Sequence, residues 1–522
     1  MANYKVGNVL PPHLTYEQRK KFFHDAKNYF WEEPFLFKSC ADNIIRRCIP
    51  EEEVTGEHLL LQLNALDELH LGSYENAKLY KEPFNNYETT TKNIAKSCSG
   101  RYIYMHNLPP RFNQKLLDNC TSMYRWYDMC PYIDNSGFGP EMLGLGEKGW
   151  FSTDQFLLEL IFHTRMKTYA CLTNDSSLAS AIYVPFYGGI YLGRHLWDSN
   201  TTVRDSLGID LFNWLLHKTE WKRMLGGDHF FVGGRISWDF RRIGDQNSRW
   251  GGNLMQLPES QNLTMLTIEA SSWSNEIAIP YPTHFHPETQ NQITEWQNRM
   301  RKQKRKYLVA FVGAPRPSMK DSVRSEIMRE CMEMDKACKL LNCSSEAYKC
   351  NNPVEVMKVF EESVFCLQPP GDSYTRRSAF DSIIAGCIPV FFHPGSAYVQ
   401  YVWYLPQDYT KYSVFIPKNL VKNGSLSIYQ TLVKVSNEKR REMREEVIRL
   451  IPKIIYVNPS ALMELEDAFE IAVKRVIERI ENNRRNASSK DKDSSWSWNH
   501  KLSSMGQPQW DTYFSDVIFT EK

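Results

Sequence analysis

Two adjacent arginines, Arg376 and Arg377, stand where the sequence predicts the start of a helix. Residues 365–367 predict a strand, 368–373 a glycine-containing loop, and 374–385, which lack Gly and Pro, a helix. A loop that leads from a strand into a helix presents free backbone N–H groups and a dipole that favours anions. Cations in the first turn oppose that dipole, at a cost of roughly 0.3–1 kcal/mol each. We therefore predict a bound phosphate or pyrophosphate, contacted by both guanidinium groups.

An alternative is that the two arginines bond local carboxylates such as Asp372. A second predicted strand, 308–313, ends in a similar turn that contains Gly313 and Arg316. This turn can bring a third cation to the same crevice.

Strands and helices alternate on both sides of these motifs, which predicts βαβ units, parallel sheets and an α/β fold. Gly386 fits the left-handed position that ends a helix. The last helix is expected to begin with Ser460 as its N-cap. The other expected elements are strands at 102–105, 179–189, 228–234, 276–282 and 388–392, and helices at 59–71, 149–166, 318–341 and 460–483.

Composition excludes several classes of protein. The chain has 522 residues with 63 Lys and Arg against 61 Asp and Glu, a net charge of +2 that argues against a nucleic-acid binder. Aromatic residues make up 13% of the chain, so most of it should fold. Six basic residues lie within 299–306; we interpret them as a solvated connecting helix rather than a nuclear signal.

Twelve cysteines and seven N-x-S/T sequons favour a protein of the secretory pathway with disulfides, although buried thiols are the alternative. Spacing does not reveal how the cysteines pair. The N-terminal residues contain no apolar segment of the length that a signal peptide or membrane anchor needs. The polar tail, 484–522, is expected to be disordered.

Six segments between about Cys98 and Arg479 resemble, in the same order, the exostosin-type glycosyltransferases of family 47, and within them the plant xyloglucan galactosyltransferase group. These segments are RYIYMHNLPPRFN, TNDSSLASAIYVPFY, DHFFVGGRISWDF, IPYPTHFHP, FVGAPRP and FCLQPPGDSYTRRSAFDSIIAGCIPVFFHPGSAY. The resemblance implies a GT-B fold, in which two Rossmann-like domains face a central cleft and the last helix crosses back to the first domain. The implied parts are an extension (1–97), an acceptor-side domain (98–290), a connecting helix (291–306), a nucleotide-sugar domain (307–483) and a tail (484–522).

The resemblance implies an inverting enzyme that transfers galactose from UDP-galactose to xylosyl side chains of xyloglucan. Asp381 occupies the position where similar enzymes carry an acidic residue, often Glu, that binds the ribose, and Gln368 and Ser373 are expected to line the same pocket. We expect no cofactor and no metal, because the D-x-D sequence that could hold one, at 491–493, lies in the polar tail. The charge of the departing diphosphate then falls to Arg316, Arg376 and Arg377.

Displacement also requires a base that takes the acceptor proton. The candidates are His106, His229 and Asp239, with Asp228 beside them. Asn107 stands where many family members carry Asp, so that position cannot supply the base. His284 and His286 have metal-like H-x-H spacing, but a loop contact is the favoured interpretation.

Two alternatives remain for the function. The chain could use another UDP-sugar, such as UDP-galacturonate, or it could be an inactive glycan-binding or scaffold relative in a Golgi synthase complex. The family resemblance places the protein on the lumenal side of the Golgi, with other glycosyltransferases as possible partners. A type II membrane anchor is usual in the family, and none is visible in this chain.

Overall fold

The computed structural model divides the chain into two compact units, Met1–Ser97 and Cys98–Lys522. In the first unit it describes the backbone of three antiparallel strands, β1 (Tyr29–Glu32), β2 (Phe35–Ser39) and β3 (Ile45–Arg47). In the second it describes residues 98–514 except 147, 199, 245–249, 320–321, 462–464 and 487–496. The helix predicted at 59–71 and the D-x-D sequence at 491–493 lie outside the described residues.

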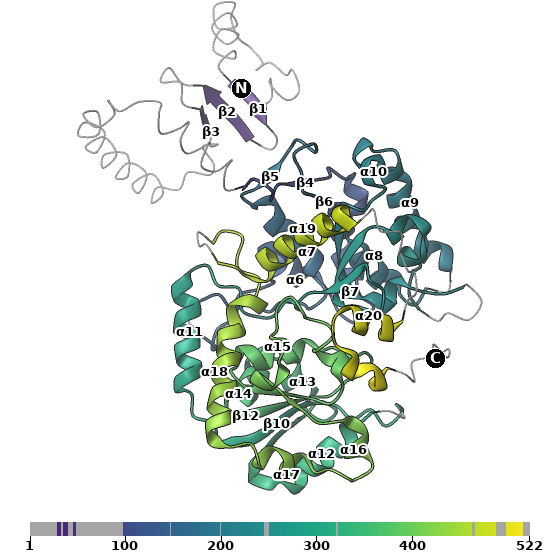
Figure 1. Cartoon of the computed structure of the whole chain (residues 1–522). Helices are drawn as coiled ribbons and strands as arrows, with labels where there is room; N and C mark the ends of the chain where they lie inside the picture. The colour runs from purple at the N-terminus through teal and green to yellow at the C-terminus, as the bar shows by residue number, and fades with distance from the viewer. Residues whose placement is uncertain are drawn as a thin grey trace, which may run out of the picture. The chain divides into compact units, whose positions relative to one another are not determined.

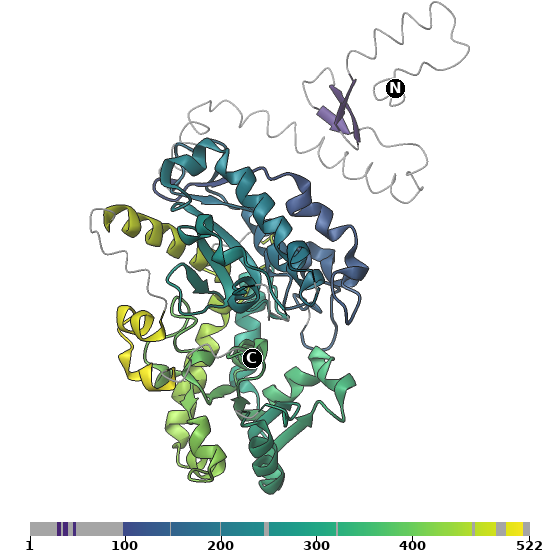
Figure 2. The same ribbon diagram turned by 90° about the vertical axis from the view of Figure 1, so that its right-hand side faces the viewer.

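The second unit contains two lobes, each built on a parallel sheet (Figures 1 and 2). The sheet of the first lobe has the order β5-β4-β6-β7-β8-β9, with all of its strands parallel. Its central strands are buried on both faces, as expected for a parallel sheet covered by helices. The strands are β4 (Ile103–Met105), β5 (Leu172–Thr173), β6 (Ala181–Tyr183), β7 (His229–Ile236), β8 (Thr264–Glu269) and β9 (Glu276–Ala278). The sequence interpretation had not identified β8.

The helices of the first lobe include α6 (Cys130–Gly137), α7 (Leu158–Lys167), α8 (Gly188–His195), α9 (Thr201–Leu216) and α10 (Thr219–Met224). The helix predicted at 149–166 was wrong at its start, because α7 begins at Leu158. Trp150 instead forms a bridge with Phe285, and the Phe151 N–H donates to His284 O at 2.9 Å. These contacts pair backbone N–H and C=O groups that would have bonded within the helix if it had started earlier.

The sheet of the second lobe has the order β11-β10-β12-β13-β14 and is also parallel. Its strands are β10 (Tyr307–Gly313), β11 (Cys338–Asn342), β12 (Ser363–Gln368), β13 (Ile388–Phe391) and β14 (Val414–Phe415). The helix predicted at 318–341 was wrong at both ends, since the structure has only α12 (Arg324–Glu333) there. Asp335 then adopts a left-handed conformation and turns the chain into β11.

The other helices of the second lobe include α11 (Gln290–Lys302), α13 (Ala347–Cys350), α14 (Pro353–Glu361), α15 (Arg377–Ile384), α16 (Lys418–Lys422), α17 (Ile428–Val433) and α18 (Asn437–Ile454). The connecting helix α11 ends at Lys302, four residues earlier than predicted. Gly386 has φ 62° directly after the α15 C-cap, so the predicted left-handed end of this helix is confirmed.

The last long helix, α19 (Ala468–Asn486), crosses back to the first lobe, where it lies beside α7 in Figure 1. Its Phe469 ring packs on Phe162 at 4.8 Å between centroids. The predicted N-cap Ser460 was wrong, because Asp467 accepts the Glu470 N–H at 2.9 Å and so caps this helix. The two-domain α/β fold with a returning helix, inferred from the family resemblance, is confirmed.

The prediction of a disordered tail was wrong for the part of the tail that the structure describes. This part contains α20 (Trp498–Ser504) and a short 3₁₀ helix (Pro508–Tyr513). Trp498 stacks on Phe514 at 4.4 Å, and Phe514 meets Tyr374 edge to face at 5.9 Å. Aromatic burial therefore outweighs the polar composition of the tail and places it against the second lobe.

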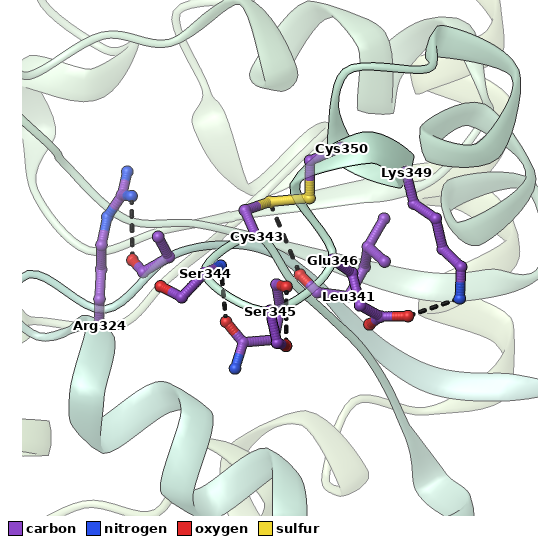
Figure 3. The surroundings of a disulfide bond; sticks show 10 residues. Arg324, Leu341, Cys343, Ser344, Ser345, Glu346, Lys349 and Cys350 are labelled. Carbon is purple, nitrogen blue, oxygen red and sulfur yellow. Dashed lines mark hydrogen bonds and ion pairs between the residues drawn. A yellow bond between two sulfur atoms is a disulfide. The ribbon is translucent and has the colours of Figure 1, made fainter.

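Among the described residues, ten cysteines form five disulfides, which confirms the disulfide interpretation. The pairs are Cys98–Cys171, Cys120–Cys130, Cys331–Cys338, Cys343–Cys350 and Cys366–Cys387. Figure 3 shows the Cys343–Cys350 bond, which joins the end of β11 to α13. On the same short segment, Lys349 pairs with Glu346 at 2.5 Å.

The Cys366–Cys387 bond joins the strands β12 and β13 that flank the predicted anion loop, across 21 residues. We expect the double variant C366A/C387A to lose about 3 kcal/mol of unfolding free energy, because the cross-link restricts the unfolded chain. The measurement is urea unfolding under oxidising conditions. As a control, C120A/C130A removes a 10-residue link whose cysteines are only half-buried, and it should lose less. Equal losses would contradict this prediction.

Candidate functional site

The order of the second sheet reverses between β10 and β12, since β11 lies on one side of β10 and β12 on the other. Ligands of open parallel sheets bind outside the carboxyl ends of the strands at such a switch point. The loop after β10 carries Arg316, and the loop after β12 leads to Arg376. The two predicted arginine loops therefore open on one crevice.

Arg376 is folded tightly over the loop after β12. Its Nη1 donates to Ser373 Oγ at 3.2 Å and to Thr375 O at 2.8 Å. A Cβ added to Gly371 would lie 1.7 Å from Arg376 Nη2, so only glycine lets the guanidinium lie there. The helix α15 begins at Arg377, three residues later than predicted, and Arg376 is its N-cap. The guanidinium and the free end of the helix thus lie side by side.

Arg324, at the first position of α12, is a cation of this crevice that the sequence interpretation missed. Its Nε donates to Pro370 O at 3.0 Å, and its Nη1 to Ala314 O at 3.4 Å. Burial, together with the charges of Arg376 and Arg316, lowers the pKa of Arg324 to about 10, against the opposing effect of Asp372. Mutual repulsion among three cations marks a place that a polyanion would stabilise.

One carboxylate, that of Asp372, pairs directly with a cation of this cluster. Arg316 pairs with Asp372 at 3.2 Å, and both side chains are largely exposed. The alternative interpretation had assigned Asp372 to Arg376 or Arg377, but its partner is Arg316, and such exposed pairs contribute little stability. Asp372 pairs with Arg316, and the charge of Arg376 also acts on the buried carboxylate of Glu269. Two carboxylates therefore stand against three cations, so a positive charge remains.

Arg377 points toward the first lobe and not into the arginine cluster. Its Nη1 donates to Thr153 O at 3.0 Å, and its Nε lies 3.4 Å from Asp381 Oδ2. Burial raises the pKa of Asp381 to about 6, against the opposing effect of Arg377. Arg377 therefore joins the two lobes at the start of the helix.

Two buried polar atoms beside α15 have no hydrogen-bond partner among the described residues. They are Asp381 Oδ1 and Gln368 Nε2. Gln368 Oε1, in contrast, accepts the Ser378 hydroxyl at 2.6 Å. One free acceptor and one free donor in a buried wall can bind the hydroxyl groups of a ligand.

Glu269, at the carboxyl end of β8, reaches from the first lobe to the anion loop. It accepts hydrogen bonds from Thr375 N at 2.7 Å and from Thr375 Oγ1 at 2.6 Å. The carboxylate is fully buried, and burial raises its pKa despite these hydrogen bonds. The sequence interpretation missed Glu269 because it missed β8.

Asp239 lies beyond the end of β7, on the same side of the first lobe. Its carboxylate pairs with Arg235 Nε at 2.6 Å and is 5% exposed. Tyr281 links this region to the loop, because its hydroxyl lies 3.0 Å from Thr375 Oγ1. Burial raises the pKa of Tyr281, the charges of Glu269 and Asp239 raise it further, and Arg376 opposes them. The charge of Asp239 thus acts on Tyr281, which contacts the anion loop.

His106 and His229 hydrogen-bond to each other, with their Nε2 atoms 3.1 Å apart. His229 Nδ1 also lies 2.8 Å from Asp228 Oδ1. The two rings contact Trp214 of α9 and Trp221 of α10, respectively. This buried pair of histidines therefore lies on the helix-covered face of the first sheet. The hydrogen bonds and ring contacts given above join the two histidines to residues of the first lobe.

At the equivalent switch point of the first sheet, a side chain of the protein occupies the place where a ligand would bind. Glu159 accepts the N–H groups of Gly189 at 2.6 Å and Ile190 at 3.0 Å, at the start of α8. Its carboxylate takes the place that an anionic ligand would need, and burial raises its pKa to about 7. Among the described residues, the cluster of Arg316, Arg324 and Arg376 lies at the switch point of the second lobe.

Residues 97–432, more than half of the chain, match the protein family described as the exostosin GT47 domain. The chain belongs to the GT47 exostosin family. The probable xyloglucan galactosyltransferase GT12 of Arabidopsis thaliana is 55% identical over 396 residues, 74% of this chain and 77% of the relative. The xyloglucan galactosyltransferase MUR3 of the same plant is 44% identical, over 84% of this chain and 74% of its own. The xyloglucan-specific galacturonosyltransferase 1 is 42% identical, over 74% and 58%, respectively.

The histidines of the H-x-H sequence in this GT47 protein are held by neighbouring groups of the protein. His284 Nδ1 contacts Thr153 N at 3.2 Å, and His286 bonds Thr153 Oγ1 and Tyr456 O. Among the described residues, the one cluster with metal-like geometry is Cys120, Asp128 and Cys130, whose cysteines are joined in a disulfide. In the same part of the chain, no helix is long and apolar enough to cross a membrane.

The buried His106 of this GT47 protein predicts a specific dependence of stability on pH. Burial, assisted by the charge of His229, lowers the pKa of His106 from 6.5 to about 3. Between these two values the unfolded chain binds the additional proton, so stability contributed by neutral His106 is lost as the pH falls. We expect the free energy of unfolding of the wild type to fall more steeply than that of His106→Gln below pH 6.5, by up to about 1.4 kcal/mol per pH unit. Urea unfolding between pH 7 and 4 tests this, and parallel curves would contradict it.

Proposed function

We propose that the protein transfers galactose from UDP-galactose to xylosyl side chains of xyloglucan, with inversion at the anomeric carbon. The observation that carries this proposal is the convergence of Arg316, Arg324 and Arg376 on the switch point between β10 and β12. A nucleoside diphosphate supplies the anionic charge that this crevice favours. Several curated relatives named as xyloglucan galactosyltransferases supply the sugar and the acceptor.

In this proposal the arginine cluster and the free end of α15 bind the diphosphate and stabilise the charge that develops as it leaves. Asp381 and Gln368, with their free buried atoms, bind the ribose hydroxyls. No metal or other cofactor is required, because guanidinium groups and backbone N–H groups neutralise the leaving group.

The acceptor hydroxyl attacks the anomeric carbon while a carboxylate of the first lobe takes its proton. The C–O bond to the diphosphate breaks in the same step, and UDP leaves with the bonding electrons. Among His106, His229 and Asp239, we propose Asp239 as the base, because it follows β7, beside the strand whose Glu269 contacts the anion loop. His106 and His229 are then positioning residues of the first sheet, and Glu269 is the second candidate carboxylate.

The oxidised cysteines support a compartment in which disulfides persist, and we propose the Golgi lumen. Other Golgi glycosyltransferases are the partners that fit this location. The relative named as a galacturonosyltransferase keeps UDP-galacturonate as the alternative donor.

The decisive experiment incubates the purified protein with UDP-galactose or UDP-galacturonate and a xylosylated cello-oligosaccharide. We expect a β-galactosylated product, identified by mass spectrometry and NMR, from the first donor. Transfer from UDP-galacturonate alone would replace the donor in this proposal. No transfer from either donor, together with no UDP binding by calorimetry, would reject it and favour an inactive glycan-binding protein.

A further inference from the structure

Two large aromatic side chains are exposed together on the loop between Cys120 and Cys130. Trp126 is 74% exposed and Tyr127 is 40% exposed. Single exposed apolar residues are normal on protein surfaces, but neighbouring aromatic rings on a fixed loop are a typical binding surface. We refer to these two residues as the aromatic platform.

The loop that carries the platform is fixed at its ends and at its base. The Cys120–Cys130 disulfide closes it, and Arg194 Nη2 donates to Asn119 O at 2.9 Å just before it. Beneath the platform, Tyr124 stacks on Tyr127 at 5.6 Å with an angle of 17° between the rings. A fixed ring loses little conformational entropy when a ligand stacks on it.

Two routes connect the platform to the proposed transfer site. Tyr127 OH donates to Asp154 Oδ2 at 2.6 Å, and the preceding residue, Thr153, accepts Arg377 Nη1 at 3.0 Å. Asp154, which contacts the platform, therefore directly follows Thr153, which contacts the first residue of α15. This places the platform on the rim of the crevice.

The second route ends at the proposed base. Tyr124 stacks on Phe156 at 5.5 Å, and Arg235 Nη1 donates to Tyr124 OH at 2.8 Å. The same guanidinium holds Asp239 at 2.6 Å. A chain of contacts through the buried side chains of Tyr124 and Arg235 thus links the platform to the carboxylate that we propose takes the acceptor proton.

We propose that the aromatic platform binds the backbone of the acceptor, a neutral β-linked polysaccharide, by stacking Trp126 and Tyr127 on its sugar rings. This inference rests on the proposed function, because it assigns the acceptor side of the same site. A neutral glycan offers apolar C–H faces and hydroxyl groups but no charge, so aromatic surface is the chemistry that recognises it. The platform binds sugar units beyond the one that reacts, and it therefore contributes to acceptor affinity and not to the chemical step.

The test uses the full chain and acceptors of increasing length, namely xylosylated cello-oligosaccharides and polymeric xyloglucan. We expect Trp126→Ala to raise KM for the long acceptors about tenfold, with kcat and the Kd for UDP unchanged. Trp126→Phe should restore part of the affinity, because it retains a ring. Tyr348→Ala is the matched control, since Tyr348 is 72% exposed on α13 of the second lobe. Unchanged acceptor KM in Trp126→Ala would overturn the assignment.

A binding measurement separates this inference from the proposed function. Titration of the protein with the same oligosaccharides, followed by calorimetry, does not require transfer. If the wild type transfers no sugar but Trp126→Ala binds the glycan about tenfold more weakly, the proposed function fails and the platform stands. If Trp126→Ala instead converts a dimer to a monomer in sedimentation without altering glycan binding, the platform is a protein interface and the inference fails.

Discussion

Arg376→Ala is expected to lower kcat/KM for UDP-galactose by 10²-fold or more and to weaken UDP binding. The guanidinium lies over Gly371 beside the N-terminus of α15, where the diphosphate is proposed to lie. One well-placed donor of this kind contributes ~2.7–4 kcal/mol to transition-state stabilisation. Steady-state kinetics give kcat/KM, and calorimetry gives the UDP affinity.

Two further variants make this expectation specific. Arg376→Lys keeps the charge but loses the forked donor geometry, so it should recover only part of the activity. Arg329→Ala removes an exposed arginine of α12 that pairs with Glu333, and it should behave as the wild type. Full activity of Arg376→Ala in a folded protein would reject the proposed diphosphate site.

Asp239→Asn is expected to lower kcat by about 10²–10⁴-fold, the range that a general base contributes. The affinity of the variant for UDP should be unchanged, since the Asp239 carboxylate pairs with Arg235 of the first lobe and, unlike Glu269, does not hold the donor loop. Because Asp239 also pairs with buried Arg235, the thermal unfolding of the variant must be measured alongside.

Glu269→Gln is the companion that distinguishes the two carboxylates. The Glu269 carboxylate accepts hydrogen bonds from the backbone N–H and the hydroxyl of Thr375. Glu269→Gln should therefore weaken UDP binding as well as turnover. Loss of kcat alone in Glu269→Gln, with Asp239→Asn nearly active, would transfer the role of base to Glu269.

Sequence patterns predicted the α/β class and the strand–loop–helix unit around Arg376 because these depend on local signals. Buried strands read as apolar runs, Gly386 ends α15, and the two arginine loops follow apolar strands. The exact residues at which helices begin and end were less predictable. The chain at Trp150 pairs with Phe285 more than a hundred residues away, and no local preference encodes that contact.

The residues missed at the site share one cause. Glu269 and Arg324 act across distances in sequence, the first on Thr375 and the second on Pro370. Arg324 had been placed inside a predicted helix, whereas it stands at the first position of α12. Their roles depend on how the lobes and loops meet, so the alternation of elements alone could not identify them. The apolar and β-branched residues of TMLTIE were the signal that could have located β8 and hence Glu269.

The returning helix α19 has a consequence for the order in which the chain can mature during synthesis. Phe469 packs on Phe162 and Tyr169, and Arg165 pairs with Asp467, so the first lobe obtains part of its interior from residues that are synthesised after the second lobe. Domains usually fold as they emerge, the N-terminal one first. Here the lobe that emerges first must wait for the lobe that emerges second. A chain that stops before Asp467 would contain the complete sequence of the first lobe, but that lobe would lack part of its core. Cellular quality control would therefore recognise it as incompletely folded.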